Sequence, residues 1–127
     1  MARIRLADAS ALIADARWSG GYYLLGLSVE CALKACILRG VQAEVLLPRT
    51  WAEKFYRHDL SQLLVMAELE HEAAFAASAR LEANWATAKD WDVDARYTDV
   101  SQTDAESLFA AVNEPVEGVF AWLATHF

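Results

Sequence analysis

Apolar side chains recur along most of this 127-residue chain at intervals of three and four residues, the spacing of one helix face. The pattern predicts a first helix over about Ile4–Ala16 and an almost uniformly apolar second helix over about Ser19–Arg39. A capping box opens a third helix at Asp59, and a fourth is predicted over about Glu72–Lys89. The last helix begins near Thr103, at a second capping box, and keeps one apolar phase to the C-terminus.

Three interruptions divide these helices. Residues 41–58 are irregular around Pro48 and predict a loop with a short helix, and residues 90–99 predict a loop with aromatic anchors. Pro115 removes a backbone donor, so the last helix should kink or break near Asn113. With 5 glycines and 2 prolines, the chain has too few turn residues for a β-sandwich or barrel. We therefore expect a single all-α domain over residues 1–127, built from four to five helices.

The second helix is long and apolar enough to raise the question of a membrane span. Glu30 and Lys34 stand at its middle, and each would cost about 2.5 to 3.5 kcal/mol at a bilayer centre. The N-terminus carries no secretory pattern, and Cys31 and Cys36 lie five apart, a helical spacing that suits neither a disulfide nor a metal clamp. These features favour a core helix with buried thiols in a cytoplasmic protein, covered by its own bundle or by a second subunit.

The net charge of −7 is unevenly distributed. Residues 1–58 carry 8 basic and 5 acidic side chains, which gives +3, and residues 59–127 carry 3 basic and 13 acidic ones, which gives −10. An acidic chain argues against tight non-specific binding of nucleic acid. The first half leaves room for a local RNA-facing patch, and the alternative is that the acidic residues only solvate the outer faces of the later helices.

Glu30 and Lys34 are the most informative polar pair, because their i, i+4 spacing places them on one helix face. They are either an ordinary partly buried ion pair, or Glu30 receives a distant cation, most plausibly Arg96, and organises a polar pocket. His58 precedes a helix N-terminus, where it could act as an acid or base or be a surface or capping residue. Arg96 beside Tyr97 could bind phosphate or stack on a base, or could fasten its loop to the bundle.

The candidate polar pocket therefore consists of five binding residues, Glu30, Lys34, His58, Arg96 and Tyr97, with no catalytic residue assigned. The sequence has no His-Glu-x-x-His, Cys-x-x-Cys or Asp-rich loop, so no metal site is expected. It also has no glycine-rich phosphate loop and no Gly-x-Ser-x-Gly elbow, so we expect neither a cofactor nor chemistry of those classes.

The apolar second helix, Tyr-Tyr-Leu-Leu-Gly-Leu-Ser-Val-Glu-Cys-Ala-Leu-Lys-Ala at residues 22–35, resembles the central helix of HEPN domains. The blocks His-Asp-Leu-x-x-Leu-Leu at 58–64, Trp-x-x-x-x-Arg-Tyr at 91–97 and Ala-Trp-Leu at 121–123 are similar to one bacterial branch of that family. The resemblance implies an up-and-down bundle of four or five helices that commonly dimerises. Many members are RNases, often toxins, and others are non-catalytic partners of minimal nucleotidyltransferases or binding domains.

The nuclease branch of that family is marked by an Arg followed, after four to six residues, by a His. No Arg stands at that spacing before His58, His71 or His126. We therefore expect a non-catalytic, homodimeric HEPN-like interaction domain, with its second helix at or near the dimer interface and a nucleotidyltransferase-type partner in a toxin–antitoxin-like system. The alternative is an atypical RNase or nucleotide-binding protein that uses Glu30, His58, Arg96 and Tyr97.

Overall fold

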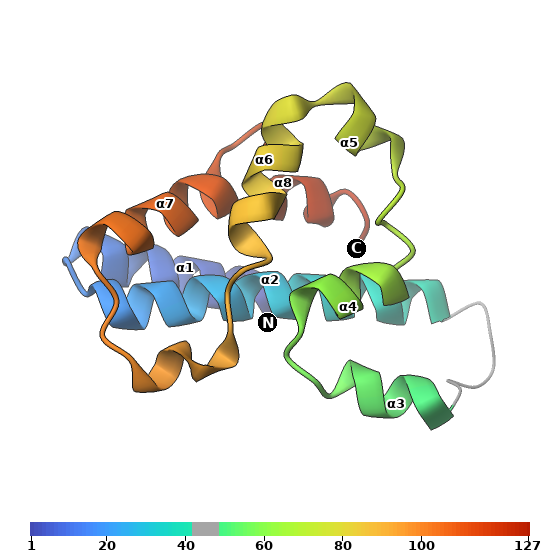
Figure 1. Cartoon of the computed structure of the whole chain (residues 1–127), viewed down its shortest axis with the longest axis horizontal. Coiled ribbons are helices and arrows are strands. Elements are labelled where there is room, and N and C mark those ends of the chain that lie inside the picture. The colour runs from blue at the N-terminus through green and yellow to red at the C-terminus, as the bar shows by residue number, and fades with distance from the viewer. Residues whose placement is uncertain (42–48) are drawn as a thin grey trace.

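The computed structural model describes the backbone of residues 1–41 and 49–127, and the side chains of residues 1–40 and 52–127 (Figure 1). Every regular element in these stretches is helical, which confirms the predicted all-α class. The elements are α1 (Ala2–Ala14), α2 (Trp18–Val41), α3 (Arg49–Phe55), α4 (Leu60–Met66), α5 (Ala73–Ala77), α6 (Ala79–Ala88), the 3₁₀ helix η1 (Val93–Tyr97), α7 (Gln102–Asn113) and α8 (Val119–Ala124). Helix α3 is the short helix predicted within residues 41–58, and the loop expected around Pro48 lies outside the described residues.

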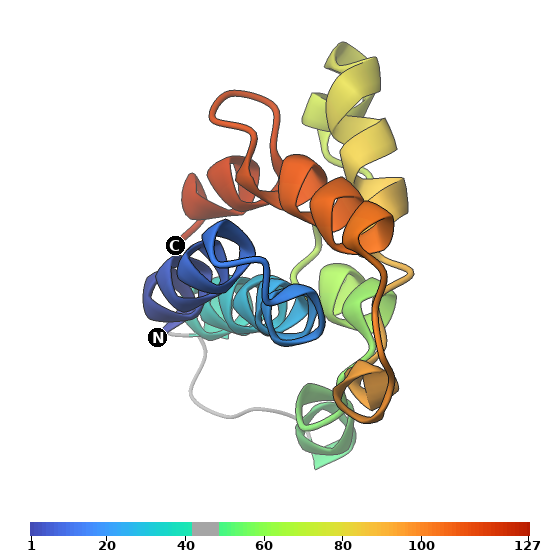
Figure 2. The same ribbon diagram turned by 90° about the vertical axis from the view of Figure 1, so that its left-hand side faces the viewer.

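Helix α2 is the axis of the fold (Figures 1 and 2). Helix α1 folds back along it, α7 and α8 pack on one side, and α4 and η1 pack on the other. Helix α6 stands across α7 rather than along α2. One continuous core joins these helices, and its largest fully buried apolar side chains are Leu25, Val29, Leu33, Leu60, Leu63, Leu108, Val112, Val119 and Leu123.

The length and apolar composition of Trp18–Gly40 would allow it to cross a membrane, and no other helix among the described residues passes that test. In the structure, 56% of its most apolar stretch is buried inside the protein. Much of that burial comes from α1, α7 and α4. This is the packing that the core-helix interpretation of the sequence predicts.

The turn between α1 and α2 depends on a left-handed residue. Ala16 has φ 57°, and the N–H of Arg17 donates to the carbonyl of Leu12 at 2.8 Å, as in helix C-caps that close with a left-handed residue. The second helix is predicted from about Ser19, and α2 begins one residue earlier, at Trp18, so Ser19 lies inside the helix. The Ser19 Oγ accepts the N–H of Val100 at 2.9 Å and so ties the α7 end of the chain to the start of α2.

Replacing Ala16 with glycine should raise the free energy of unfolding by about 0.5 to 1 kcal/mol, because an L side chain is strained at positive φ and glycine is not. Ala11 is the matched control, because it is exposed in the interior of α1. There the same replacement should cost about 0.5 to 1 kcal/mol. Urea unfolding followed by circular dichroism measures both, and a loss of stability in Ala16→Gly would contradict the expected relief of strain.

The prediction of one continuous helix over about Glu72–Lys89 is wrong. The chain breaks at Ser78 into α5 and α6, because the Ser78 Oγ accepts the N–H of Leu81 at 3.0 Å and so caps α6. The same hydroxyl donates to the carboxylate of Glu117, and the side chain of Asn84 donates to the Glu117 carbonyl at 3.0 Å. The Ser78 hydroxyl therefore connects the start of α6 to the loop before α8, and Ser78 does not belong to an apolar helix face.

The last predicted helix is confirmed in its break and corrected at its start. It divides into α7 and α8 on either side of Pro115, as the missing backbone donor predicts. Ser101, and not Thr103, is the N-cap of α7, where its Oγ accepts the N–H of Asp104 at 3.1 Å. At the other capping box the prediction holds, because the Asp59 carboxylate accepts the N–H of Gln62 at 3.1 Å.

Candidate functional site

Glu30 is a charged residue inside the apolar core helix, and its side chain is 5% exposed. A buried carboxylate is costly unless donors surround it. Two donors reach it. The ammonium of Lys34, one turn further along α2, lies 2.7 Å from Oε1, and the Nδ1–H of His58 lies 2.9 Å from each carboxylate oxygen. The predicted ion pair is therefore present, and the distant partner of Glu30 is a histidine.

His58 is held in place by the start of α4. It stands directly before Asp59, which fixes the entry of the chain into that helix through its cap. The histidine side chain is 46% exposed, so one side of the ring contacts the buried carboxylate and the other faces solvent. Because the ionised carboxylate only accepts hydrogen bonds, Nδ1 carries the proton and Nε2 is the nitrogen available to a ligand.

Lys34 also connects α2 to the end of α3. Its Nζ lies 5.4 Å from the ring centroid of Phe55, within the range of a cation–π contact. Phe55 in turn packs edge-on against Tyr56, with ring centroids 5.6 Å apart. Three of the five residues predicted for the pocket, Glu30, Lys34 and His58, therefore form one cluster at the junction of α2, α3 and α4.

Arg96 does not reach this cluster, which corrects the expected pairing with Glu30. Its guanidinium lies 4.7 Å from the ring centroid of Tyr97, its neighbour in η1, and both side chains are exposed. The Asp92 side chain caps η1 by accepting the N–H of Asp94 at 2.8 Å and so fixes the direction of the turn. Arg96 and Tyr97 form a separate surface stack rather than part of a pocket around Glu30.

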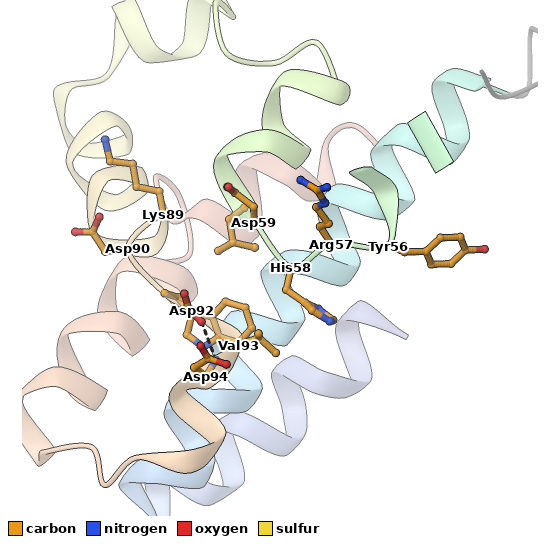
Figure 3. A pocket seen from close by; sticks show the side chains of 11 residues that line it. Tyr56, Arg57, His58, Asp59, Lys89, Asp90, Asp92, Val93 and Asp94 are labelled. Atoms are coloured by element: carbon orange, nitrogen blue, oxygen red, sulfur yellow. Dashed lines mark hydrogen bonds between the residues drawn. The ribbon is translucent and has the colours of Figure 1, made fainter. Parts of the chain in front are cut away.

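An open pocket of about 590 Å³ lies beside His58, between residues 56–60 and residues 89–94. Figure 3 shows that its side chains do not converge: Tyr56 points out on one side, and Lys89 and Asp90 point out on the other. Its wall carries four aspartates, Asp59, Asp90, Asp92 and Asp94, beside the cations of Arg57 and Lys89. The pocket therefore offers neither a uniform cationic cradle for phosphate nor a set of carboxylates aimed at one point.

Trp91 forms the floor of this pocket and is 3% exposed. It lies directly over Gly26 of α2, where a Cβ would overlap the indole ring. Its ring also packs against Tyr23, with centroids 6.2 Å apart. Trp91 is one of the aromatic anchors that the sequence predicts for residues 90–99, but the local pattern does not show which residue it packs against. The available signal was Gly26 itself, because glycine inside a helix is about 1 kcal/mol less favourable than alanine and often marks close packing.

The remaining reactive side chains do not add a catalytic centre. Burial raises the pKa of Cys36 to about 11, and burial together with the Glu30 charge raises the pKa of Cys31, so both thiols stay protonated near neutral pH. The Nε2 of His126 lies 3.0 Å from the Glu72 carboxylate, a partner that its sequence spacing did not suggest, and Trp122 donates to the same oxygen at 2.8 Å. Within the described residues, no group of three or more His, Cys, Asp or Glu side chains could hold a metal ion.

One face of the α1–α2 pair carries apolar side chains that the fold does not fully cover. On α2 these side chains lie at intervals of three, four and seven residues, and two more lie at the start of the chain. We call the whole set the association face: Met1, Ile4, Leu24, Leu27, Cys31 and Leu38. Ile4 is 56% exposed and Leu38 50% exposed. Helix α1 packs along α2, which brings the start of α1 beside the α2 strip.

Comparison of the chain with protein-family models, with curated proteins and with solved structures gives no match.

Proposed function

We propose that this protein is a non-catalytic interaction domain that pairs with a second copy of itself through the association face, as expected for a HEPN-like helical bundle. The observation that carries the proposal is the strip from Leu24 to Leu38, which stays apolar over about 21 Å of α2 at 1.5 Å per residue. Soluble proteins rarely leave a long apolar helix face without a partner.

The dimensions of the face support a dimer. Two adjacent helices of about 10 Å diameter, α2 of about 36 Å and α1 of about 20 Å, present a projected area of roughly 560 Å². A stable interface covers about 800 Å² on each partner. The α1–α2 pair is therefore large enough to form most of a dimer interface by itself.

The charges around the face also favour a second copy over an oppositely charged partner. Arg5 pairs with Asp8 at 3.3 Å, and Lys34 pairs with Glu30 at 2.7 Å. Arg17 pairs with Asp15 at 3.2 Å. Because these rim cations are neutralised within the same chain, two copies can approach without strong repulsion between like charges.

The arrangement of the polar residues supports a role without catalysis. Arg96 stacks on Tyr97 at the surface, away from the Glu30 cluster, so the four polar residues of an RNase-like pocket are not assembled. From the HEPN resemblance alone, we further propose a nucleotidyltransferase-type partner for the dimer, a toxin–antitoxin-like pairing and a cytoplasmic location.

Replacing Leu27 with glutamate tests the proposal. A carboxylate at the centre of the association face would be desolvated without a partner, so the dimer should weaken at least a hundredfold while the helical circular dichroism is retained. Light scattering at tens of micromolar protein should give the dimer mass for the wild type and the monomer mass for Leu27→Glu.

The matched control is Val65→Glu. Val65 is 55% exposed on α4, outside the association face, so this variant should remain dimeric. A wild-type protein that is monomeric at the same concentration, or a Leu27→Glu protein that still dimerises, would contradict the proposed interface.

A second candidate function is that His58 acts as a general base on RNA or a nucleotide. The observation in its favour is the Glu30–His58 contact, which orients the ring through Nδ1 and leaves Nε2 on the exposed side. An RNA-cleavage assay separates the two candidates. We expect the wild type and His58→Ala to leave RNA equally intact, whereas cleavage by the wild type that His58→Ala abolishes would favour the base.

A further inference from the structure

Residues 52–58, which we call the α3 arm, lie at the margin of the bundle. They comprise the end of α3 and the linker to α4, and α3 packs chiefly against α4, the next helix in the chain. Figures 1 and 2 show α3 standing apart from α1, α2 and α7. The exposed side chains of the arm are Glu53, Lys54, Tyr56, Arg57 and His58. Among residues 52–58, whose side chains the structure describes, Phe55 packs against the apolar core and the side chains from Tyr56 to His58 are exposed.

Two side chains of the arm hold it against α2. Phe55 is half-buried beneath the Lys34 ammonium, and His58 donates to the Glu30 carboxylate. Lys34 and His58 meet at the same carboxylate, because Lys34 also donates to Glu30. The polar contact of the arm with the core helix thus passes through one buried acid, Glu30, and Phe55 adds an apolar contact.

The position of Glu30 makes this attachment separable from the rest of the fold. Glu30 belongs to the core helix and stays in place whether or not the arm is docked, and Lys34 remains as its partner on the same helix. Opening the arm breaks the His58 hydrogen bond and the Phe55 contact, and leaves the buried leucines of α2 covered by α1, α7 and α8. Segments with few apolar contacts and exposed side chains are the ones that open locally in native proteins.

We propose that the α3 arm is a strap that opens as a unit while the bundle stays folded. The carboxylate of Glu30, which we call the catch, holds the arm closed through its contact with His58. Opening withdraws the wall formed by Tyr56, Arg57 and His58 from the 590 Å³ pocket. It also uncovers the flank of α2 at Lys34, next to the association face. The strap depends on contacts within one chain and does not require the proposed dimer.

Hydrogen exchange read by mass spectrometry tests the strap on the full chain. In His58→Ala, the amides of residues 53–57 should exchange at least fivefold faster than in the wild type, and those of α2 and α7 should keep their rates. Glu30→Gln keeps the shape of the catch and removes its charge, and should loosen the same segment. His71→Ala is the matched control, because His71 is also exposed but lies in the α4–α5 connection.

Two results would overturn the strap. Unchanged exchange of residues 53–57 in His58→Ala would show that the arm is not held through the catch. Faster exchange spread equally over the arm, α2 and α7 would show that the His58 contact stabilises the whole bundle instead. If Glu30→Gln fails to fold, His58→Ala decides the question alone, since its partly exposed side chain can be removed without opening the core.

Discussion

Replacing Gly26 with alanine should lower the free energy of unfolding by about 1 to 2 kcal/mol, although alanine is the better helix former. The added Cβ would overlap the buried indole of Trp91, and a tryptophan packed against both α2 and Tyr23 cannot move aside freely. Overpacking of this kind typically costs 1 to 3 kcal/mol and here must exceed the gain of about 1 kcal/mol in helix propensity. Urea unfolding followed by circular dichroism gives the value directly.

Gly40 provides the matched control on the same helix, because a Cβ there meets no atom within 4 Å. Gly40→Ala should be neutral or more stable by up to about 1 kcal/mol. Shortening the opposing side chain as well, in Gly26→Ala with Trp91→Leu, should cost less than the sum of the two single changes. A Gly26→Ala protein as stable as the wild type would mean that Trp91 does not lie on α2 in solution.

Replacing Glu30 with alanine should lower the free energy of unfolding by about 2 kcal/mol. The change leaves the Lys34 ammonium and the His58 N–H without their shared acceptor and opens a gap in the flank of the core helix. Losing one partner of a fully buried pair costs 3 to 5 kcal/mol, and the smaller figure follows because Lys34 and His58 are partly exposed and can turn to water.

Glu30→Gln separates charge from shape in this experiment. The amide keeps one acceptor oxygen and nearly the same volume, so its cost should be about half that of Glu30→Ala. Thermal and urea unfolding of the two variants beside the wild type provide the comparison. A loss below about 0.5 kcal/mol in Glu30→Ala would indicate that the carboxylate is hydrated in solution and holds neither Lys34 nor His58.

Most helices could be predicted from the sequence because their boundaries are determined by residues at or next to the helix ends. The apolar period over α1 and α2, the cap at Asp59 and the break at Pro115 all act within a few residues of the backbone that they shape. The division between α5 and α6 was missed for the opposite reason. Ser78 fits a helical period, but its hydroxyl bonds Glu117, which is 39 residues away. Nothing in the local pattern specifies that contact.

The candidate site shows the same limit. The i, i+4 spacing is sufficient to predict the Glu30–Lys34 pair, whereas the distant partner of Glu30 is expected to be Arg96 and is His58 in the structure. Both residues stand near an aspartate that caps a helix, so the local caps do not distinguish them. His58 nevertheless lies over α2, whereas Arg96 lies beside Tyr97 at the surface. The direction of a short connection depends on the packing of the whole fold.

The close packing of Trp91 on Gly26 couples two positions that are 65 residues apart in the chain. Neither position can change freely by itself, since a larger residue at 26 displaces the indole and a smaller residue at 91 leaves an unfilled hole against α2. In a lineage of such proteins the two should change together, from glycine with tryptophan to a larger residue with a smaller one. A coupled exchange of this kind would mark descent from a common bundle even where the surrounding sequence has diverged.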